Sequence, residues 1–461
     1  MFYKHLQKLS IIGLLCYTST SLIAGEVHEF TLDNGLKLIV KEDHRAPVVV
    51  SQVWYKIGSS YEQEGKTGLS HILEHMMFKG TKKHPPGEFS RIMAVNGASE
   101  NAFTGYDYTA YFQTLEKSRL PISFELEADR MRHLVLTEKE FAKEKQVVAE
   151  ERRMRTEDKP ISFMYEHFRA TAFQTSPYQN PIVGWMSDIE NYTLADLQVW
   201  YQRWYAPNNS VVVVIGDVEP QAVLALAKQH FGPLEPSKIT PPHLRPEVEQ
   251  FGTKRITVKL PAKLPYFVMG YKVPTLTTIA KENRWEVYAL EVLAYILDGG
   301  ESARLSKNLV RGQQIATSIG VSYRLFSRLE VLFTVSGIPG NKHTVSKLEK
   351  AIQEQIKQVQ TTLVDEVELE RVKTQLRASK VYELDSHFYQ GMQIGQLETI
   401  GLDWQLKDSY LDNIKTITAE QVLAVARKYL IDKNLTVAVL EPQSLEKNPS
   451  TKQQSVTGEA H

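Results

Sequence analysis

The chain has 461 residues, which is too many for one ordinary hydrophobic core. Of these residues, 42% are hydrophobic, 23% charged and 10% aromatic, a composition typical of globular proteins. Lysine plus arginine equals aspartate plus glutamate at 54 each, so the charge gives no support for nucleic-acid binding. This composition excludes collagen, a disordered chain and a disulfide-rich scaffold, and two or three domains are expected.

Residues 1–24 have the pattern of a secretory signal peptide. Lys4 and Lys8 flank the start of a short apolar run, and small residues follow up to Ala24. A membrane anchor is the alternative, but the polar residues 17–21 end the apolar run well before the roughly 20 residues that span a bilayer. Cys16 is the one cysteine, so cleavage leaves a thiol-free chain suited to a periplasmic or secreted location.

The first half after this segment alternates strands and helices. Alternating apolar residues on both sides of Asn34-Gly35 predict a β-hairpin, because this dipeptide favours a tight turn. The next predicted elements are, in chain order, a strand at 48–55, helices at 68–78, 122–134, 138–154 and 194–205, and a strand at 211–215. Prolines at positions 233, 236, 241, 242 and 246 then predict a linker over residues 231–255.

The sequence after the linker repeats the pattern of the sequence before it. A helix, turn and strand that begin at Thr193 align without gaps on a segment that begins at Thr418. Residues 136–151 match residues 363–378 in pattern. We therefore predict two homologous α+β domains, and chance similarity between amphipathic helices is the alternative. The predicted ranges are 26–230 and 256–442, followed by a flexible polar tail at 443–461.

The segment His71-Ile72-Leu73-Glu74-His75 is the strongest local pattern in the chain. With about 100° of rotation per residue, a helix places its two histidines and its glutamate on one face. Two neutral imidazoles at this spacing can ligate zinc, and a carboxylate one turn away can accept a proton from water. Surface histidines on an amphipathic helix are the alternative.

A third metal ligand is expected from the helix predicted at 138–154. Glu144 and Glu151 lie about two turns apart on it and share a stripe with Phe141 and Val148 that should face inward. A buried carboxylate needs a partner, and metal ligation by Glu151 would supply one. The alternative is a solvated helix whose glutamates pair with the arginines at positions 152, 153 and 155.

The inverted motif His-x-x-Glu-His, followed downstream by the run Glu144-Lys-Gln-Val-Val-Ala-Glu-Glu151, resembles the pitrilysin family of metallopeptidases. That family includes the insulin-degrading enzymes and the mitochondrial processing peptidases. The likeness extends from Leu36 to Pro442, nearly the whole chain after the signal segment. The resemblance implies one Zn²⁺ per chain, with these roles: ligands His71, His75 and Glu151, general base Glu74, and accessory carboxylate Glu144.

The resemblance also implies a fold and an activity. Each domain is expected to have a mainly antiparallel sheet with helices packed on one face, and the two domains to form a clamshell around a peptide chamber. The implied activity is that of an exported zinc metalloendopeptidase that hydrolyses peptides or unfolded polypeptides without a covalent intermediate. Asn101 and Ala102 look like part of the family's edge strand, where they would contact substrate, and an ordinary alternating strand is the alternative.

The second domain lacks the metal-binding groups. In the repeat, the positions of the two histidines, the base and the third ligand are occupied by Leu290, Ala294, Leu293 and Ala378. Arg311 stands where the family places an oxyanion arginine, but the expected tyrosine falls near Thr317 or Ser318, and Tyr323 is out of register.

This missing tyrosine suggests a homologous partner subunit without zinc that supplies it. We expect peptide or unfolded polypeptide as substrate, no nucleic-acid partner, and no membrane span after signal removal. A non-catalytic scaffold and a chamber that binds peptides without cutting them are the alternatives. The complete set of four metal-site residues argues against a pure scaffold.

Overall fold

The computed structural model describes residues 25–240 and 246–444. The predicted signal peptide, part of the proline-rich stretch, and the polar tail from residue 445 lie outside the described residues. None of the helices within the described ranges is long and apolar enough to cross a membrane.

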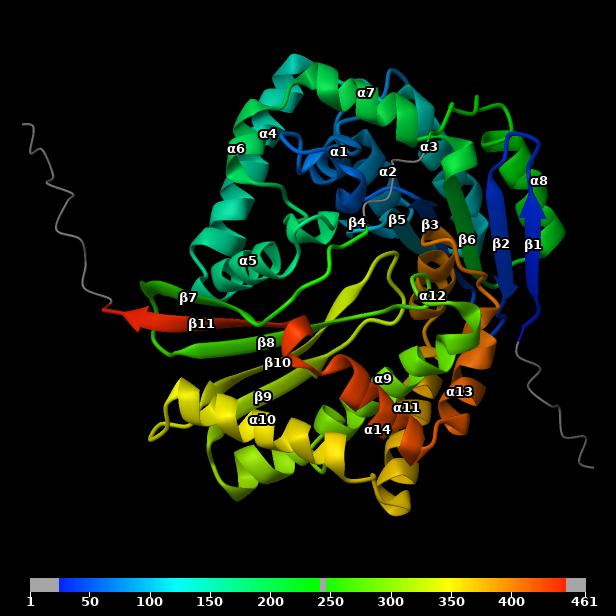
Figure 1. Cartoon of the computed structure of the whole chain (residues 1–461). Helices are drawn as coiled ribbons and strands as arrows, with labels where there is room; N and C mark the ends of the chain where they lie inside the picture. The colour runs from blue at the N-terminus through cyan, green and yellow to red at the C-terminus, as the bar shows by residue number, and fades with distance from the viewer. Residues whose placement is uncertain (1–24, 241–245, 445–461) are drawn as a thin grey trace, which may run out of the picture.

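The first half forms a six-stranded sheet in the order β1-β2-β6-β3-β5-β4 (Figure 1). Its strands are β1 Val27–Thr31, β2 Lys37–Glu42, β3 Val48–Tyr55, β4 Ser99–Thr104, β5 Thr109–Glu116 and β6 Ser210–Gly216. β6 is a run of β-branched residues that is buried along its whole length, because it lies between β2 and β3 in the centre of the sheet. β4 lies at the edge.

The second half forms a five-stranded sheet in the order β7-β11-β8-β10-β9. Its strands are β7 Lys254–Pro261, β8 Tyr266–Val273, β9 Ala316–Ser322, β10 Val331–Pro339 and β11 Leu435–Gln443. In both sheets the last strand of the half is inserted between two earlier ones, parallel to one and antiparallel to the other. This strand-for-strand correspondence, with β1 as the one addition, confirms the predicted two-domain α+β fold.

Helices connect the strands in the same order in the two halves. The first half contains α1 Leu69–Met76, α2 Glu88–Val95, α3 Leu120–His133, α4 Glu138–Arg152, α5 Pro160–Ala172, α6 Met186–Asn191, α7 Leu194–Trp204 and α8 Pro220–His230. The second contains α9 Arg284–Asp298, α10 Val345–Thr361, α11 Glu366–Glu383, α12 His387–Thr399, α13 Leu406–Thr416 and α14 Ala419–Tyr429. The helices α7 and α14 both begin with a capping box, at Thr193 and Thr418, which supports the aligned repeat.

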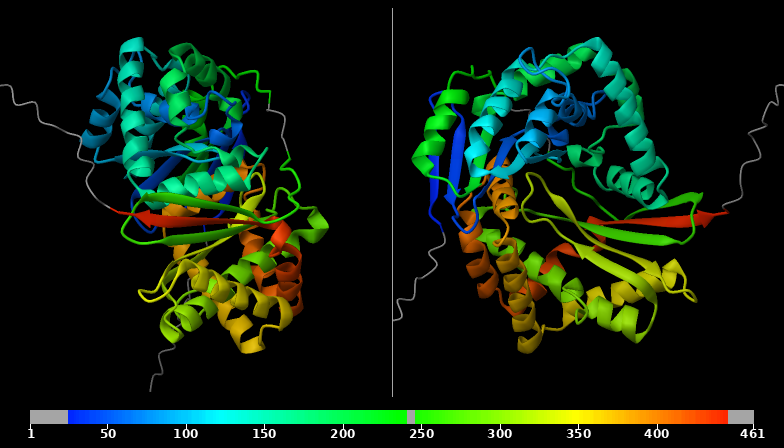
Figure 2. Two further views of the ribbon diagram at one scale, coloured as in Figure 1. Left: turned by 60° about the vertical axis from the view of Figure 1, so that its left-hand side comes forward. Right: turned by 180° about the vertical axis from the view of Figure 1, so that it is seen from behind.

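One helix of each half packs on the sheet of the other half (Figures 1 and 2). Val212 and Val214 of β6 face the helices of their own half, whereas Val213 faces Ile394 of α12 on the opposite side of the sheet. In the reverse direction, Phe168 of α5 packs into the core of the second half. The sequence predicted helices on one face of each sheet, and this exchange adds a helix to the other face.

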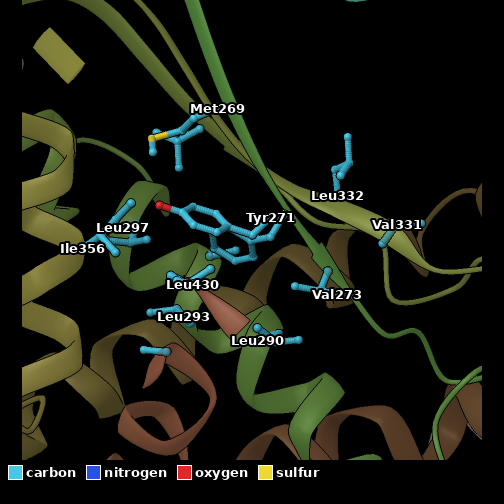
Figure 3. Close-up of a cluster of buried hydrophobic side chains, with 14 of the residues drawn as sticks. Met269, Tyr271, Val273, Leu290, Leu293, Leu297, Val331, Leu332, Ile356 and Leu430 are labelled. Atoms are coloured by element: carbon cyan, nitrogen blue, oxygen red, sulfur yellow. The ribbon is translucent and has the colours of Figure 1, made fainter. Parts of the chain in front are cut away.

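In the second half, the positions that align with the metal motif belong to the hydrophobic core. Leu290 and Leu293 of α9, which align with His71 and Glu74, are fully buried against Tyr271 and its neighbours (Figure 3). Apolar side chains thus fill the place that polar ligands occupy in the first half. The range expected for the linker is partly structured, because Phe231 is buried in the first core and β7 already begins at Lys254.

Candidate active site

The helix α1 carries the His-x-x-Glu-His motif and begins directly after Gly68. Gly68 has a φ of 91°, and a side chain there would collide with the carbonyl oxygen of Val183. The carboxylate of Glu62 accepts hydrogen bonds from the backbone amides of Gly68 and Ser70, at 2.7 and 2.6 Å. These contacts satisfy two of the free amides at the start of the helix and help to fix its position.

The C-terminal end of α4 brings Glu151 to the two histidines of α1. Nε2 of His75 lies 3.3 Å from Oε2 of Glu151, and Nε2 of His71 lies 3.7 Å from the same oxygen. The three ligand atoms all lie within 4.8 Å of one another. The structure therefore brings together the three residues that were predicted to hold a metal.

The chemistry of this donor set fits Zn²⁺. Two imidazole nitrogens and one carboxylate oxygen are a common zinc set, and they leave a fourth position open. Burial, followed by the nearby His75 and Arg155, lowers the pKa of His71 to about 3. His71 is therefore neutral at ordinary pH, as a metal ligand must be.

Two further groups hold the ligands in place. Nδ1 of His75 lies 3.3 Å from Oε2 of Glu144, whose other oxygen forms an ion pair of 2.7 Å with Nζ of Lys79. Glu144 thus orients the second histidine rather than joining the three ligand atoms. Arg155 pairs with Oε1 of Glu151 at 2.5 Å, so one oxygen of that carboxylate faces the histidines and the other faces an arginine.

Arg155 lies four residues after Glu151, a spacing at which helical side chains meet, although α4 does not continue to residue 154 as predicted. The helix ends at Arg152 and is followed by a π-helical turn, Arg153–Glu157. Glu151 therefore shows both arrangements considered from the sequence. One of its oxygens pairs with an arginine, and the other lies close to the two histidines.

Glu74 faces the same cavity as the ligands. One of its oxygens, Oε2, accepts a hydrogen bond from the hydroxyl of Thr104 at the end of β4. Burial raises the pKa of Glu74, and the Thr104 hydrogen bond and the nearby His75 oppose that change. The carboxylate therefore has one oxygen fixed by β4 and the other available.

A cavity of about 680 Å³ lies in front of these residues. Its walls come from α1, from β4, from the end of α4 and the turn after it, from α5 and from residues 179–183, and every described residue that lines it belongs to the first half. The predicted substrate residues Asn101 and Ala102 lie on the β4 wall, at the edge of the sheet. The amide of Ala102 donates to the side chain of Asn101 at 2.9 Å, so a strand that pairs here must displace that side chain.

Sequence reasoning missed several residues of this cavity, including Tyr165 and Arg169 of α5. The guanidinium of Arg169 lies 4.5 Å from the ring centre of Tyr106, another cavity residue. No local pattern indicates these side chains. The apolar face of α5 packs on the sheet of the other half, and the sequence alone does not show which side of the helix then faces the cavity.

The two oxyanion candidates lie elsewhere. Arg311 belongs to a π-helical turn of the second half and donates a hydrogen bond to the carbonyl of Glu301. Tyr323 is partly buried against the core of the second half, where its hydroxyl donates to the carbonyl of Pro274 at 2.7 Å. Neither residue lines the cavity.

Comparisons with known proteins agree with this arrangement. Residues 37–185 match the family model described as Insulinase (Peptidase family M16), and residues 191–376 match the one described as Peptidase M16 inactive domain. The chain is 34% identical over 418 residues to the zinc protease PqqE of Helicobacter pylori, with 89% of this chain and 92% of that protein covered.

Solved structures have the same fold. The crystal structure of a protease from Helicobacter pylori superposes with a TM-score of 0.85 at 31% identity, over 91% of this chain and all of that one. The periplasmic protease PqqL from Escherichia coli superposes with a TM-score of 0.76 at 18% identity. That match covers 90% of this chain but only 48% of PqqL.

Proposed function

The chain belongs to the pitrilysin family of peptidases, family M16, and from this premise we propose that it is an exported zinc metalloendopeptidase that hydrolyses peptides or unfolded polypeptides. The observation that carries the proposal is the approach of His71, His75 and Glu151 beside a carboxylate, Glu74, in one cavity. A scaffold would have no use for this complete set. Relatives named zinc proteases support zinc as the metal. The proposal assigns one ion per chain to this set of three ligands.

The three metal ligands, Glu74 and Thr104 each have a defined task in peptide-bond hydrolysis. A zinc ion held by the two histidines and Glu151 would polarise the scissile carbonyl and an attacking water molecule. Glu74 accepts the proton of that water while the oxygen attacks the carbonyl carbon, and it then delivers the proton to the leaving nitrogen as the C–N bond breaks. Thr104 holds one oxygen of Glu74, so the other is directed into the cavity.

Substrate would bind in an extended conformation along β4. An edge strand has unpaired backbone groups, and an added peptide strand can pair with them irrespective of its sequence. Asn101 and Ala102 would provide these contacts beside the metal ligands. This mode of binding favours unfolded polypeptides over folded proteins.

We further propose that the enzyme works with a homologous subunit that lacks zinc. The cavity is built from the first half alone, and the second half places neither Arg311 nor Tyr323 in it. The arginine and tyrosine that the resemblance implies as oxyanion donors are therefore outside this cavity, and the homologous subunit would supply them. This chain covers only 48% of PqqL, so a single PqqL chain is long enough to contain a second unit of the same size as this protein. The description of PqqL as periplasmic supports export of the present protein.

Comparison of the wild type with Glu74→Gln tests the proposed activity. The amide keeps the size and polarity of the side chain but cannot accept the proton of water, so cleavage of a quenched peptide library should fall to background. Zinc content should remain that of the wild type. Cleavage by the variant at the wild-type rate would remove Glu74 from the reaction. A wild type that binds zinc but cleaves no peptide would favour a peptide-binding subunit.

A further inference from the structure

Two equivalent hairpins, one from each half, meet in the centre of the molecule. The β4–β5 hairpin of the first half turns at residues 105–108, and the β9–β10 hairpin of the second half turns at residues 323–330. These hairpins occupy the same position in the order of their respective sheets. Figure 1 shows the β9–β10 hairpin directed toward β4 and β5. The contact between them is made by Arg328 and Asp107.

Arg328 is almost completely enclosed by the first half, with 11% of its side chain exposed. Its backbone amide donates to Oδ2 of Asp107 at 3.1 Å, and its Nε lies 3.4 Å from Oδ1. Its Nη2 donates to the hydroxyl of Ser60 at 2.8 Å and to the carbonyl of the same residue at 3.1 Å. The guanidinium also lies over the ring of Tyr61, 3.9 Å from its centre. One side chain of the second half thus binds three residues of the first.

Asp107 depends on this arginine for its charge balance. Its carboxylate is 6% exposed, and its other hydrogen bonds from described residues come from neutral groups, the hydroxyls of Ser60 and Tyr178. A buried carboxylate that loses its cation is strongly unfavourable, so the chain around it rearranges to reach water. Removal of the guanidinium would therefore move the turn that carries Asp107.

That turn is directly continuous with the candidate site. Thr104, which binds Glu74, precedes it, and Tyr106 within it lines the cavity. The substrate edge at Asn101 and Ala102 belongs to the same strand, β4. A displacement of the turn is transmitted to this edge because a strand is stiff along its length.

We propose that Arg328 of the metal-free half is a positioning residue, which acts through Asp107 to hold β4 in the geometry that binds substrate. The proposal rests on the proposed function, since it assumes that polypeptides bind along β4. It gives the second half a role in the site even though none of its described residues lines the cavity.

Substrate affinity without turnover tests the proposal. In a Glu74→Gln background, the dissociation constant of fluorescein-labelled β-casein, an unfolded polypeptide, is measured by fluorescence anisotropy. Arg328→Ala should weaken binding about tenfold, within the range found for residues that act on a site through intermediate contacts. Arg328→Lys, which keeps the charge, should restore part of the affinity. Zinc content should stay unchanged in both variants, because the metal ligands lie on other elements.

Arg324→Ala is the matched control, because Arg324 is an exposed arginine of the same hairpin turn. It should leave the affinity within about twofold of the parent, as expected for a surface substitution. If Arg328→Ala fails to fold, Asp107→Asn and Arg328→Lys provide the same comparison.

The possible outcomes separate this proposal from the proposed function. Unchanged affinity in the Arg328 variants, or an equal loss in Arg324→Ala, would overturn the role of Arg328. A parent that binds β-casein while the wild type cleaves no peptide would overturn the peptidase activity but leave the positioning role intact. A parent that shows no binding, with a wild type that shows no cleavage, would overturn both.

Discussion

The buried ion pair between Arg152 and Glu166 allows a quantitative test of how the candidate metal ligands are held in place. Arg152 follows Glu151 at the end of α4, and it donates two hydrogen bonds of 2.8 Å to Glu166 of α5. A third hydrogen bond, of 2.9 Å, reaches the carbonyl of Gly184. The two charged side chains are 4% and 5% exposed. Glu166→Gln therefore leaves a guanidinium charge buried without its full partner.

Removal of one partner from a buried ion pair costs about 3–5 kcal/mol. Glu157 lies 3.4 Å from Nε of Arg152 and compensates in part, so we expect a loss of about 3 kcal/mol, the lower end of that range. The control is Arg153→Ala, because Arg153 pairs with Glu150 at the surface, where the two side chains are 44% and 65% exposed. Solvent screens such a pair, which contributes at most about 1 kcal/mol.

Urea unfolding of the zinc-free proteins, followed by circular dichroism, measures both losses. Zinc is removed so that ligand binding does not stabilise one variant more than another. A Glu166→Gln protein that is no less stable than Arg153→Ala would refute the reasoning, because it would show that water reaches the pair.

Three further substitutions test separate parts of the structure. Burial raises the pKa of Glu62 to about 7 from 4.5, so the folded state holds a proton here that the unfolded state releases, and the contribution of Glu62 to stability should fall by about 3 kcal/mol as the pH rises through this interval. Glu62→Gln should remove this contribution, so its stability relative to the wild type should rise by about that amount in urea unfolding measured from pH 4.5 to 7. Gly395→Ala should lower the melting temperature, because its Cβ would lie 2.1 Å from an indole ring of β3, whereas Gly252→Ala meets no atom within 4 Å and should not. Glu144→Gln weakens the support of His75, so zinc affinity should fall about 10- to 100-fold in a competition titration with a chelator.

The elements that sequence reasoning predicted correctly are those whose pattern is local. Strand β3 at Val48–Tyr55 has the predicted bounds, and α7 begins at Leu194 as predicted. The motif residues of α1 share a face because helical geometry alone dictates it. The inward stripe of a second helix indicated Glu151 as the third ligand, and the resemblance to a family favoured this reading over pairing with arginines.

The unpredicted features depend on contacts between distant segments. Phe168 of α5 packs beside Gly270 of the other sheet, and Gly395 of α12 packs beside Trp54. Each glycine allows a close approach whose partner no local pattern reveals. The π-helical turn after Arg152 was also missed, because its residues differ little from those of an ordinary helix end.

Zinc analysis of purified variants tests the central claim most directly. The account predicts about one zinc per chain in the wild type and in Glu74→Gln, since Glu74 is assigned as base and not as ligand. It predicts strong loss of zinc in each of the ligand variants His71→Ala, His75→Ala and Glu151→Gln. Wild-type zinc content in any one of these three, with the protein folded, would contradict the assigned site.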